Sequence, residues 1–545
     1  MALPRRPYES GRTAMAKTLD RTTKQNAPPV GDRRKWWVLV AMVFGFFMPM
    51  LDNLVVNVAL PTIQRKLGAG VSGLQWIIDA YTLTFASFML TGGALGDLYG
   101  RKRFFVSGLV VFTTGSLLCG LSGSTGQLIG FRALQGLGAA MLVPGSLSII
   151  SATFSGKERG AAIGIWAAMS GLAIAIGPVL GGVLVEHVSW QSIFYVNVPI
   201  GAIGLALTLL VVRESRDASK SRRLDPPGLV TGTAGLFFLV YGLIEGNGRG
   251  WTDPLIVGAF ILSVVLLAVF FWVESHRASP MLPLSFFRIP TFAASNVVAA
   301  AVFFALFGTV FFLTLYLQNI QHYSPVQAGV RLLAFSVMML IVAPIAGRLS
   351  DKYGSRWFMT VGTLLAASGM ALLLRTQPGS PYFSVLLPGF VILASGLAMT
   401  MTPMTAAVMG SVEIRHAGVA SAATNTSREL GGVFGIALLG AVVTSSFKRT
   451  LLAKLIAGGL PKAAATAVVA QAGASAAAGN THALNTPGGP RVSHLVSQAV
   501  PGSFVHAIHV GMLVAVGFMI LASAVSVAFV RTHVRSDDEA PVAAH

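Results

Sequence analysis

The sequence predicts an all-α integral membrane protein with fourteen transmembrane helices, and three observations carry this prediction. Hydrophobic residues make up 54% of the 545 residues and charged residues only 11%, whereas a soluble protein contains roughly 25% charged residues. The mean hydropathy is +0.71. Apolar stretches of about 20 residues, the length of helix that crosses a bilayer, recur along the whole chain. These features exclude a soluble enzyme, a disordered chain and a collagen-like chain.

The apolar stretches are continuous and lack the alternation of a membrane β-barrel. The first one follows a polar segment that has no small-residue cleavage site, so we interpret it as a retained helix and not as a signal peptide. We place the spans at 37–61, 75–95, 104–122, 127–151, 160–183, 192–212, 227–245, 254–274, 292–317, 327–347, 357–375, 383–408, 418–444 and 503–530.

The positions of Lys and Arg predict the orientation of the chain, because cytoplasmic loops are enriched in both. With the N-terminus inside, 27 of the 39 Lys and Arg residues fall in cytoplasmic segments, and the short outer loops hold only four. We therefore expect both termini to be cytoplasmic. The net charge of +19 is then a signal of topology and does not indicate a nucleic-acid partner.

One segment occurs twice and predicts how the chain is divided. Gly93, Asp97, Gly100, Arg101 and Lys102 follow the second span, and Gly347, Asp351, Gly354 and Arg356 follow the tenth in the same spacing. Duplicated segments indicate a transporter with related halves. Because the copy follows the tenth span and not the eighth, we infer that two helices are inserted between the halves. The predicted parts are an N-terminal tail (1–35), a six-helix bundle (36–212), a linker with two inserted helices (213–290), a second six-helix bundle (291–531) with a long external loop (445–502), and a C-terminal tail (532–545).

Further short motifs accompany this repeat. They are Asp52 with Asn57 and Pro61 in the first span, Arg132 with Gln135 and Gly136 in the fourth, Gly177, Pro178, Gly181 and Gly182 in the fifth, Pro280 with Pro283 after the eighth, and Asn425 with Arg428 in the thirteenth. Together they resemble the motifs of the major facilitator superfamily, and within it those of the fourteen-helix drug:proton antiporters of the EmrB/QacA type. Ser355 departs from the pattern, since it stands in place of the first basic residue of the second loop motif.

The resemblance implies a major facilitator fold and a function. The expected protein is a proton-driven exporter of lipophilic, cationic compounds that works by alternating access in a bacterial plasma membrane. It would use the proton motive force, need no cofactor and act as a monomer, with substrate, protons and membrane lipids as its partners. Three alternatives remain open: a narrow exporter of an endogenous metabolite, lipid or antibiotic, a proton-coupled importer, and a sensor or assembly factor on a transporter scaffold.

Charged groups at membrane depth are expensive unless they are paired or hydrated, so each is a candidate site. Asp52, Asp79 and Arg132 fall at comparable heights in the outer half of the membrane, where a carboxylate can pair with the guanidinium. Asp52 would take up a proton or a cationic substrate, but not both at once. The structural alternative is a static ion pair that holds the first bundle together.

The thirteenth span carries Arg428 next to Glu429. Adjacent helix residues point about 100° apart, so we do not expect these two to pair. Glu429 is a second candidate for protonation or cation binding. Glu245 and Glu274, at the edges of the inserted helices, are expected to be solvated.

The loop and antiporter motifs suggest mechanical roles. Asp97 can accept hydrogen bonds from helix amides or an arginine and so close the inner side in one state, while Arg101 and Lys102 face the anionic leaflet. The glycines and Pro178 of the fifth span would bend that helix and allow close packing.

An apolar cavity for lipophilic cations would suit aromatic and flexible Met side chains. Candidates for its lining are Phe46, Phe47, Phe303, Phe304, Phe307, Met399, Met401 and Met404. The sequence contains no phosphate-binding Gly-x-x-x-x-Gly-Lys-Ser/Thr loop, so we do not expect ATP-driven transport. Its histidines are scattered and Cys119 is its only cysteine, which argues against a metal site.

Overall fold

The computed structural model describes residues 32–69, 71–154, 156–216, 226–276, 284–412, 417–476 and 489–531. These residues form sixteen α-helices, one short 3₁₀ segment and two π-helical segments. An all-helical chain is the expected result in lipid, where each backbone N–H and C=O must find its partner within the same segment. Most of the predicted N-terminal tail (1–31) and the tail at 532–545 lie outside the described residues.

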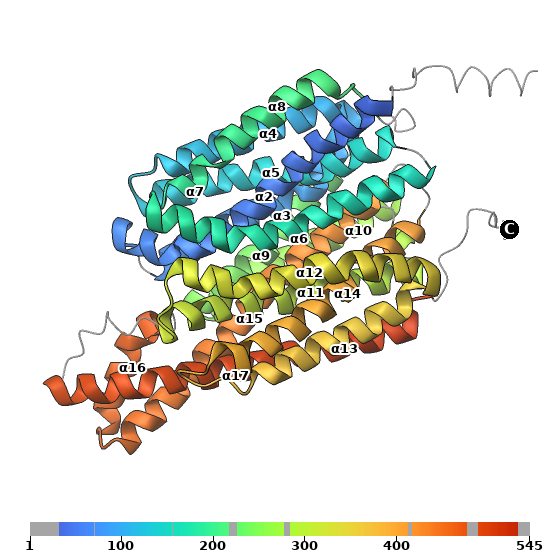
Figure 1. Cartoon of the computed structure of the whole chain (residues 1–545). Helices are drawn as coiled ribbons and strands as arrows, with labels where there is room; N and C mark the ends of the chain where they lie inside the picture. Colours follow the sequence, from blue (N-terminus) through green and yellow to red (C-terminus); the bar gives the residue numbers. More distant parts are fainter. Residues whose placement is uncertain are drawn as a thin grey trace, which may run out of the picture.

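The elements follow one another in the order shown in Figure 1. They are α2 (Asp32–Leu67), α3 (Val71–Tyr99), α4 (Arg101–Gly120), α5 (Thr125–Thr153), α6 (Gly156–His187), α7 (Ser192–Tyr195), α8 (Asn197–Val211), α9 (Pro226–Arg249), α10 (Pro254–His276), η1 (Leu284–Arg288), α11 (Pro290–Leu315), η2 (Tyr316–Ile320), α12 (Pro325–Tyr353), α13 (Ser355–Leu373), η3 (Tyr382–Leu386), α14 (Leu387–Gly410), α15 (Ala417–Ala457), α16 (Lys462–Ala476) and α17 (Gly489–Phe529).

Local sequence signals explain several helix ends. Ser124 caps α5 by accepting a hydrogen bond from the amide of Gln127, and Ser324 forms a capping box with Gln327 at the start of α12. Two glycines of the repeated segment separate their helices. Gly100 between α3 and α4 has a φ of 120°, and Gly354 between α12 and α13 has a φ of 86°, a region that side chains with a Cβ rarely adopt.

Twelve spans in the described part of the chain are long and apolar enough to cross a membrane. The helices α3 and α6 are not among them, although they contain 29 and 32 residues. Both helices contain residues whose side chains lie outside the described part of the chain. The predicted span at 192–212 is divided into α7 and α8 by a turn residue, Val196.

The first half of the chain, α2 to α8, packs as one bundle in which α5 contacts α3 and α4, and α2 contacts α6 and α8. Its core contains large side chains that solvent does not reach, among them Phe105, Phe112 and Trp166. In lipid such a core is held by close packing of atoms, because removing apolar surface from lipid brings no hydrophobic gain.

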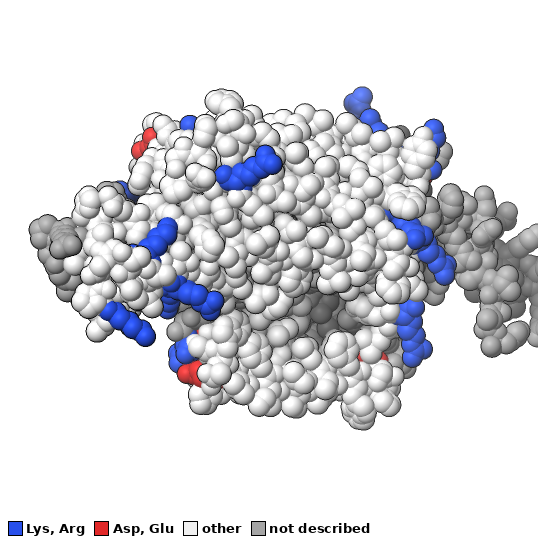
Figure 2. Space-filling view, turned by 90° about the horizontal axis from the view of Figure 1, so that it is seen from below, with Lys and Arg blue, Asp and Glu red and all other residues white. Residues whose placement is uncertain are grey.

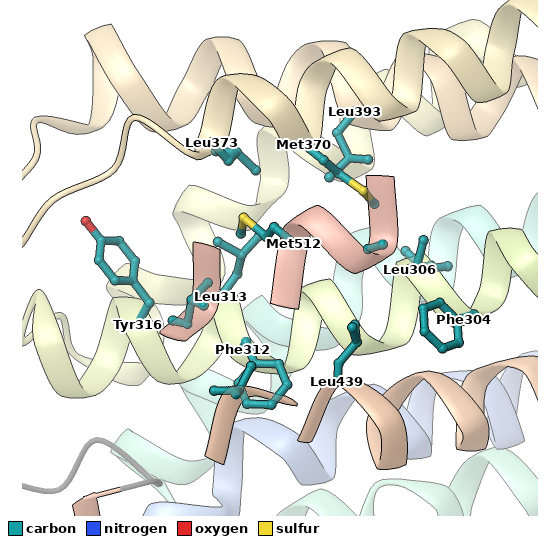
Figure 3. Close-up of a cluster of buried hydrophobic side chains, with 14 of the residues drawn as sticks. Phe304, Leu306, Phe312, Leu313, Tyr316, Met370, Leu373, Leu393, Leu439 and Met512 are labelled. Carbon is teal, nitrogen blue, oxygen red and sulfur yellow. The ribbon is translucent and has the colours of Figure 1, made fainter. Parts of the chain in front are cut away.

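The second half, α11 to α17, forms a second bundle on the other side of the molecule (Figure 1). Figure 3 shows part of its core, to which α11 contributes Phe304, α13 Met370, α15 Leu439 and α17 Met512. Within this core the Phe304 ring stacks on Phe518 at 4.1 Å between centroids.

The two bundles meet along two lines of contact. On one side α6 packs against α12, and on the other α3 packs against α15. The helix α9 contacts both α3 and α15, whereas α10 packs mainly on α9. The pair α9–α10 therefore covers one side of the boundary between the bundles and leaves much of α10 exposed.

The helices α15 and α17 are each 41 residues long, which corresponds to about 60 Å and exceeds the roughly 30 Å of hydrocarbon. Together with α16 they extend the second bundle at one end (Figure 1). The predicted external loop 445–502 is therefore helical over much of its described part, and residues 477–488 lie outside that part.

Charge is distributed as expected for a protein embedded in lipid. On the face shown in Figure 2, Lys and Arg gather toward the two ends of the molecule and the band between them is mostly uncharged. The same view shows a hollow in this face of the molecule.

Candidate functional site

A buried ion pair lies inside the first bundle. The Asp52 side chain on α2 accepts a hydrogen bond from Nη1 of Arg132 on α5, and the side chains of both residues are 0% exposed. Two amides complete the shell of the carboxylate. Nε2 of Gln135 donates at 2.8 Å and Nδ2 of Asn197 at 2.9 Å, both to Oδ1 of Asp52. The structure thus joins Asp52, Arg132 and Gln135, which the sequence singles out, in one network.

Arg132 is also held by groups other than the carboxylate. Its Nε donates to the carbonyl of Ile77 at 3.0 Å, its Nη1 donates to Oε1 of Gln135 at 2.8 Å, and its guanidinium lies 4.2 Å from the centroid of the Tyr81 ring. Its Nη2 is buried and has no hydrogen-bond partner among the described residues. The guanidinium therefore links α2, α3 and α5, and the N–H donors of its Nη2 stay unused among the described residues.

Two members of this network were not predicted as site residues. Asn197 begins α8 and also donates to Oγ of Ser116 on α4 at 3.0 Å. The segment Asn197-Val-Pro199-Ile-Gly201 also resembles a motif of the same family, so the sequence carries a signal for Asn197. It carries none for Ser116, which is one of many serines in apolar spans. Cys119 lies beside this network, with its Sγ 3.7 Å from Oε1 of Gln135.

Asp79 does not join the network, contrary to the expectation that it lies near Arg132. Ile77 and Tyr81 face Arg132, and helix residues two positions away point to the other side. Asp79 is half-buried on the side of Trp76, whose Nε1 donates to Oε1 of Glu245 on α9 at 2.6 Å. The inserted helix α9, not the arginine, is thus the neighbour of this face of α3.

The predicted solvation of two glutamates on the inserted helices is only partly correct. Glu245 is half-buried and forms an ion pair with Arg249 at 2.7 Å. Glu274 is 3% exposed and therefore buried, because the end of α10 packs near η1 and the start of α11.

Glu429 lies at a cavity between the two bundles. The cavity has a volume of about 50 Å³ and is lined from the first half by α2, α3 and α6 and from the second by α11, α12 and α15. Besides Glu429 its walls carry Asn53, Asn57 and Thr82. Glu429 forms no ion pair within the described ranges. Among the predicted aromatic and Met lining residues, Phe307 lines the cavity, whereas Phe46 stacks on Trp166 inside the first core.

Arg428 points away from Glu429, as predicted from the helix geometry. Its Nη2 donates to Oγ1 of Thr405 on α14 at 2.7 Å and its Nη1 to Oδ1 of Asn425 at 3.3 Å. The guanidinium also lies 5.5 Å from the centroid of the Phe303 ring. Arg428 and Asn425 thus form a polar contact between α14 and α15 near the second core.

The first loop motif makes a set of contacts at one end of the bundle. Asp97 is 6% exposed and accepts a hydrogen bond from Nε of Arg101 at 2.8 Å. The Nη1 of Arg101 also reaches the carbonyl of Ser148 on α5 at 3.4 Å. The pair thus ties the start of α4 to the ends of α3 and α5.

The turn at Gly100 requires a glycine for a second reason besides its φ. A Cβ at this position would lie 2.8 Å from the carboxylate of Glu214. That carboxylate accepts hydrogen bonds from the backbone amides of Lys102 at 3.1 Å and Arg103 at 3.2 Å. Glu214, which follows α8, therefore caps the start of α4, and the sequence did not identify it. Gly93 lies in α3 one turn before Asp97.

The second loop motif, at residues 347–356, is more exposed to solvent than the first. Asp351 is exposed and forms no ion pair with any residue that the structure describes. Arg356 lies 5.6 Å from the centroid of Trp357, and Gly347 packs on Thr402 of α14. The two copies of the motif thus differ in their contacts, although both surround a glycine with positive φ.

The motif of Gly177, Pro178, Gly181 and Gly182, which resembles the antiporter motif of the family, lies where α6 meets two other helices. A Cβ at Gly177 would lie 2.9 Å from that of Leu54, and a Cβ at Gly181 3.1 Å from Cγ1 of Val55, both on α2. Across the boundary, a Cβ at Gly329 of α12 would lie 2.6 Å from the carbonyl oxygen of Pro178. Gly182 is also buried. These small residues allow the backbones of α2, α6 and α12 to approach closely.

The remaining motif positions lie around these sites. Asn57 lines the cavity, and its Nδ2 donates to the carbonyl of Asn53 at 2.8 Å. Pro61 is inside α2. Gly136 lets α5 contact the backbone of α3 at Tyr81. The motif Pro280–Pro283 lies outside the described residues.

Comparison with known proteins identifies the family. Residues 42–436 match the model of the Major Facilitator Superfamily. The chain belongs to this superfamily. It is 38% identical over 421 residues to the multidrug resistance protein Stp of Mycobacterium tuberculosis, an alignment that covers 77% of this chain and 78% of that protein. It is 34% identical over 516 residues to the tetracenomycin C resistance and export protein of Streptomyces glaucescens, covering 93% of this chain and 94% of that protein.

A solved structure agrees with the fold. A bacterial homologue of the human lysosomal transporter Spinster, in an inward-facing and occupied conformation, has a TM-score of 0.59 at 18% identity, with 92% of this chain and 98% of that chain covered. The resemblance to the major facilitator superfamily found in the sequence motifs is thus confirmed. The protein is a multi-pass membrane transporter of the major facilitator fold and not an enzyme.

Proposed function

We propose that the protein is a proton-driven exporter of lipophilic, cationic compounds that works by alternating access. Two of its relatives are named as a multidrug resistance protein and as a resistance and export protein, which supports export and a broad class of substrates. The bacterial origin of these relatives supports a location in a bacterial plasma membrane. The distribution of Lys and Arg supports cytoplasmic termini.

The proposed architecture has fourteen transmembrane helices. It counts α3 and α6 as spans, because both contain more than the roughly 20 residues needed to cross the bilayer. The chain then divides into a six-helix bundle at 36–212, the inserted pair α9–α10 within 213–290, and a second six-helix bundle at 291–531. A monomer is sufficient for this arrangement.

The observation that carries the proposal is the cavity with Glu429. Both halves line it, so a solute in this cavity is exposed to one side or the other according to how the halves tilt. A carboxylate on its wall can hold a proton or a cation, and exclusive occupancy by one of them couples their movements. The volume of about 50 Å³ holds only a few water molecules, so the cavity must open to admit a drug.

The contacts at the bundle boundary suggest how it opens. The close approach of α6 and α12 at Pro178 and Gly329 brings the halves together at one end. The Asp97–Arg101 pair sits at the other end of the first bundle, near α8 and the loop motif. In the proposed cycle, rocking of the bundles separates α6 from α12 at Pro178 and Gly329 and brings together the ends of the two bundles that carry the loop motifs.

Asp52 and Arg132 have a second role in this proposal. Their ion pair joins α2 to α5 beside the cavity, since Asn53 and Asn57 on the same helix line it. Protonation of Asp52 would weaken its hold on Arg132 and change the packing of α2. Asp79 is the remaining candidate for coupling, through the contact between α3 and α9.

The energetics of exchange are favourable. One proton charge that crosses 100 mV supplies about 2.3 kcal/mol, which corresponds to roughly a fiftyfold gradient of substrate. A substrate with one positive charge that exchanges for one proton cancels the voltage, so the pH difference alone would drive its export.

The test is active efflux of a fluorescent lipophilic cation from bacterial cells that lack their own pumps. Empty vector, wild type, Asp52→Asn and Glu429→Gln are compared with and without a protonophore. We expect wild-type efflux to collapse with the protonophore, and Glu429→Gln to lose active efflux. Glu186→Gln, at an exposed acidic position near the end of α6, serves as the matched control, and the amount of each protein at the cell surface is measured.

Two results would contradict this proposal. Wild-type efflux that continues with the protonophore would exclude proton coupling. Absence of efflux for every cation tested, with good surface expression, would exclude the broad drug exporter. If efflux survives Glu429→Gln but not Asp52→Asn, then the coupling carboxylate is Asp52.

A second candidate function is a narrow exporter of an endogenous metabolite or antibiotic. The relatives named for tetracenomycin C and puromycin resistance favour it. Both functions predict the same motifs, so a panel of chemically unrelated substrates distinguishes them. Transport of only one structural class would support the narrow exporter.

A further inference from the structure

A basic pocket lies at one end of the first bundle, where α2 and α4 begin and α8 ends. Its volume is about 510 Å³, and its wall carries Arg34, Lys102, Arg103, Arg213 and Glu214. This volume is within the range of pockets that bind small molecules. Four cations and one carboxylate give the pocket a net charge of +3.

The single carboxylate is already engaged. Glu214 accepts hydrogen bonds from the backbone amides of Lys102 and Arg103 at the start of α4, where the helix dipole favours a negative charge. Its nearest contact with a side-chain cation of the pocket is the 3.8 Å separation from Nε of Arg103. Most of the positive charge in the pocket is therefore not neutralised by Glu214.

Two of the cations are held in place by the end of α8. Nε of Arg34 donates to the carbonyl of Val211 at 3.2 Å, and Nζ of Lys102 donates to that of Leu209 at 2.9 Å. A guanidinium has five N–H donors and an ammonium has three, so both groups keep donors for a further partner. The side chain of Arg103 is 78% exposed, and Arg213 is exposed too. The pocket thus presents converging donors for an anion.

The rest of the wall is apolar and continues onto the surface that faces lipid. Leu209 and Leu210 line the pocket and are 53% and 73% exposed. Trp36 and Trp37 near the start of α2 are 41% and 54% exposed, as expected for aromatic side chains at the level of the lipid headgroups. A small soluble anion gains nothing from this apolar wall, whereas an amphiphile fits both parts.

We propose that this pocket binds the phosphate headgroup of an anionic phospholipid, with the lipid chains against Leu209 and Leu210. Basic pockets at the ends of transmembrane helices bind anionic headgroups in this way. In the proposed orientation this pocket faces the cytoplasmic leaflet, but the binding of the lipid does not depend on that orientation. A bound lipid would link the starts of α2 and α4 to the end of α8.

The experiment is native mass spectrometry of the purified full-length protein in detergent, titrated with phosphatidylglycerol or phosphatidylcholine. The test variant is Arg103→Gln with Arg213→Gln, since both side chains are exposed. The matched control is Arg348→Gln with Lys352→Gln, which removes two exposed cations from the second bundle. Wild type should prefer phosphatidylglycerol. The test variant should bind it about thirtyfold more weakly, which corresponds to about 1 kcal/mol for each cation removed.

Additional measurements keep the result interpretable. If the double variant unfolds in detergent, Arg103→Gln alone should weaken binding about fivefold. Glu214→Gln should strengthen it about fivefold, because one negative charge is removed. Inorganic phosphate and glycerol 3-phosphate are added as soluble competitors, and neither should displace the lipid at equal concentration.

Several outcomes would overturn the proposal. Equal binding of the two lipids to wild type, or equal losses in the test and control variants, would exclude this pocket as an anionic lipid site. Displacement of the lipid by equimolar inorganic phosphate would identify a site for free phosphate instead. An unchanged affinity of Glu214→Gln for phosphatidylglycerol would show that the charge of the pocket does not determine lipid binding. Because binding is measured without transport, a failed efflux experiment leaves this result unaffected.

Discussion

Removal of both charges of the buried ion pair should destabilise the protein no more than removal of one of them. In Asp52→Asn, Arg132 stays charged at a site with 0% exposure and loses the one carboxylate with which it pairs among the described residues. In Arg132→Gln, the carboxylate keeps the two amide donors from Gln135 and Asn197 but loses its counter-charge. An uncompensated buried charge costs about 3–5 kcal/mol.

The double variant Asp52→Asn with Arg132→Gln leaves neither charge behind. Its loss of stability should be close to that of one single variant, so the coupling energy between the two positions should be about 3 kcal/mol. This corresponds to a factor of roughly 150 in an equilibrium constant. Asp79→Asn is the matched control, because Asp79 is half-buried and outside the network, and it should cost less than about 1 kcal/mol.

The assay is equilibrium unfolding of the purified variants in mixed micelles titrated with dodecyl sulfate, followed by helix content. Free energies of unfolding from the four proteins of the cycle give the coupling energy directly. If the two single effects simply add, or if Asp79→Asn costs as much as Asp52→Asn, then the ion pair does not stabilise the folded protein and this reasoning is wrong.

Three further predictions concern the helix contacts and the driving force. Gly329→Leu should reduce efflux more than tenfold, because a Cβ there would lie 2.6 Å from the backbone of α6, whereas Gly258→Leu on the exposed face of α10 should leave efflux unchanged. Efflux is measured in cells with matched surface expression, and normal efflux in Gly329→Leu would refute the packing role. Gly100→Ala should lower the free energy of unfolding by about 1–3 kcal/mol, because the φ of Gly100 is 120° and the carboxylate of Glu214 lies close to it. Dodecyl sulfate titration measures this loss, and Gly258→Ala is the control. Efflux of a singly charged cation from vesicles should stop when nigericin removes the pH difference and continue when valinomycin with potassium removes the voltage; the reverse pattern would exclude one-for-one exchange.

Much of the fold follows from the sequence because lipid imposes strict rules. A span must be about 20 apolar residues long, and its backbone must be hydrogen-bonded within the helix. The start of α12 at Ser324, Pro325 and Gln327 can likewise be read from local signals. The outer parts of α15 and α17 were harder to predict, because beyond the membrane an Ala-rich segment is equally compatible with helix and loop.

The site could be predicted only in part, and the reason is helix rotation. Asp52 and Arg132 have the same depth and are both charged, so their pairing could be foreseen. Asp79 has the same depth as well, but its direction depends on the rotation of α3 about its axis, which the depth of a residue does not reveal. Glu214 was missed for a different reason, since its partners are backbone amides that leave no mark in the sequence.

The two candidate carboxylates differ in what protonation would cost. A proton on Asp52 leaves Arg132 without its counter-charge inside the bundle, at a cost of about 3–5 kcal/mol. The membrane voltage supplies only about 2.3 kcal/mol for one charge at 100 mV, which is less than this cost. Protonation of Asp52 would therefore require a second contribution, such as the release of a bound cation or another group that neutralises the charge of Arg132. Glu429 forms no ion pair in the described part of the chain and already borders the cavity between the bundles, so a proton can exchange there without breaking such a contact. We therefore propose that Glu429 carries the exchanging proton and that Asp52 and Arg132 hold α2 against α5 while the cavity changes its access.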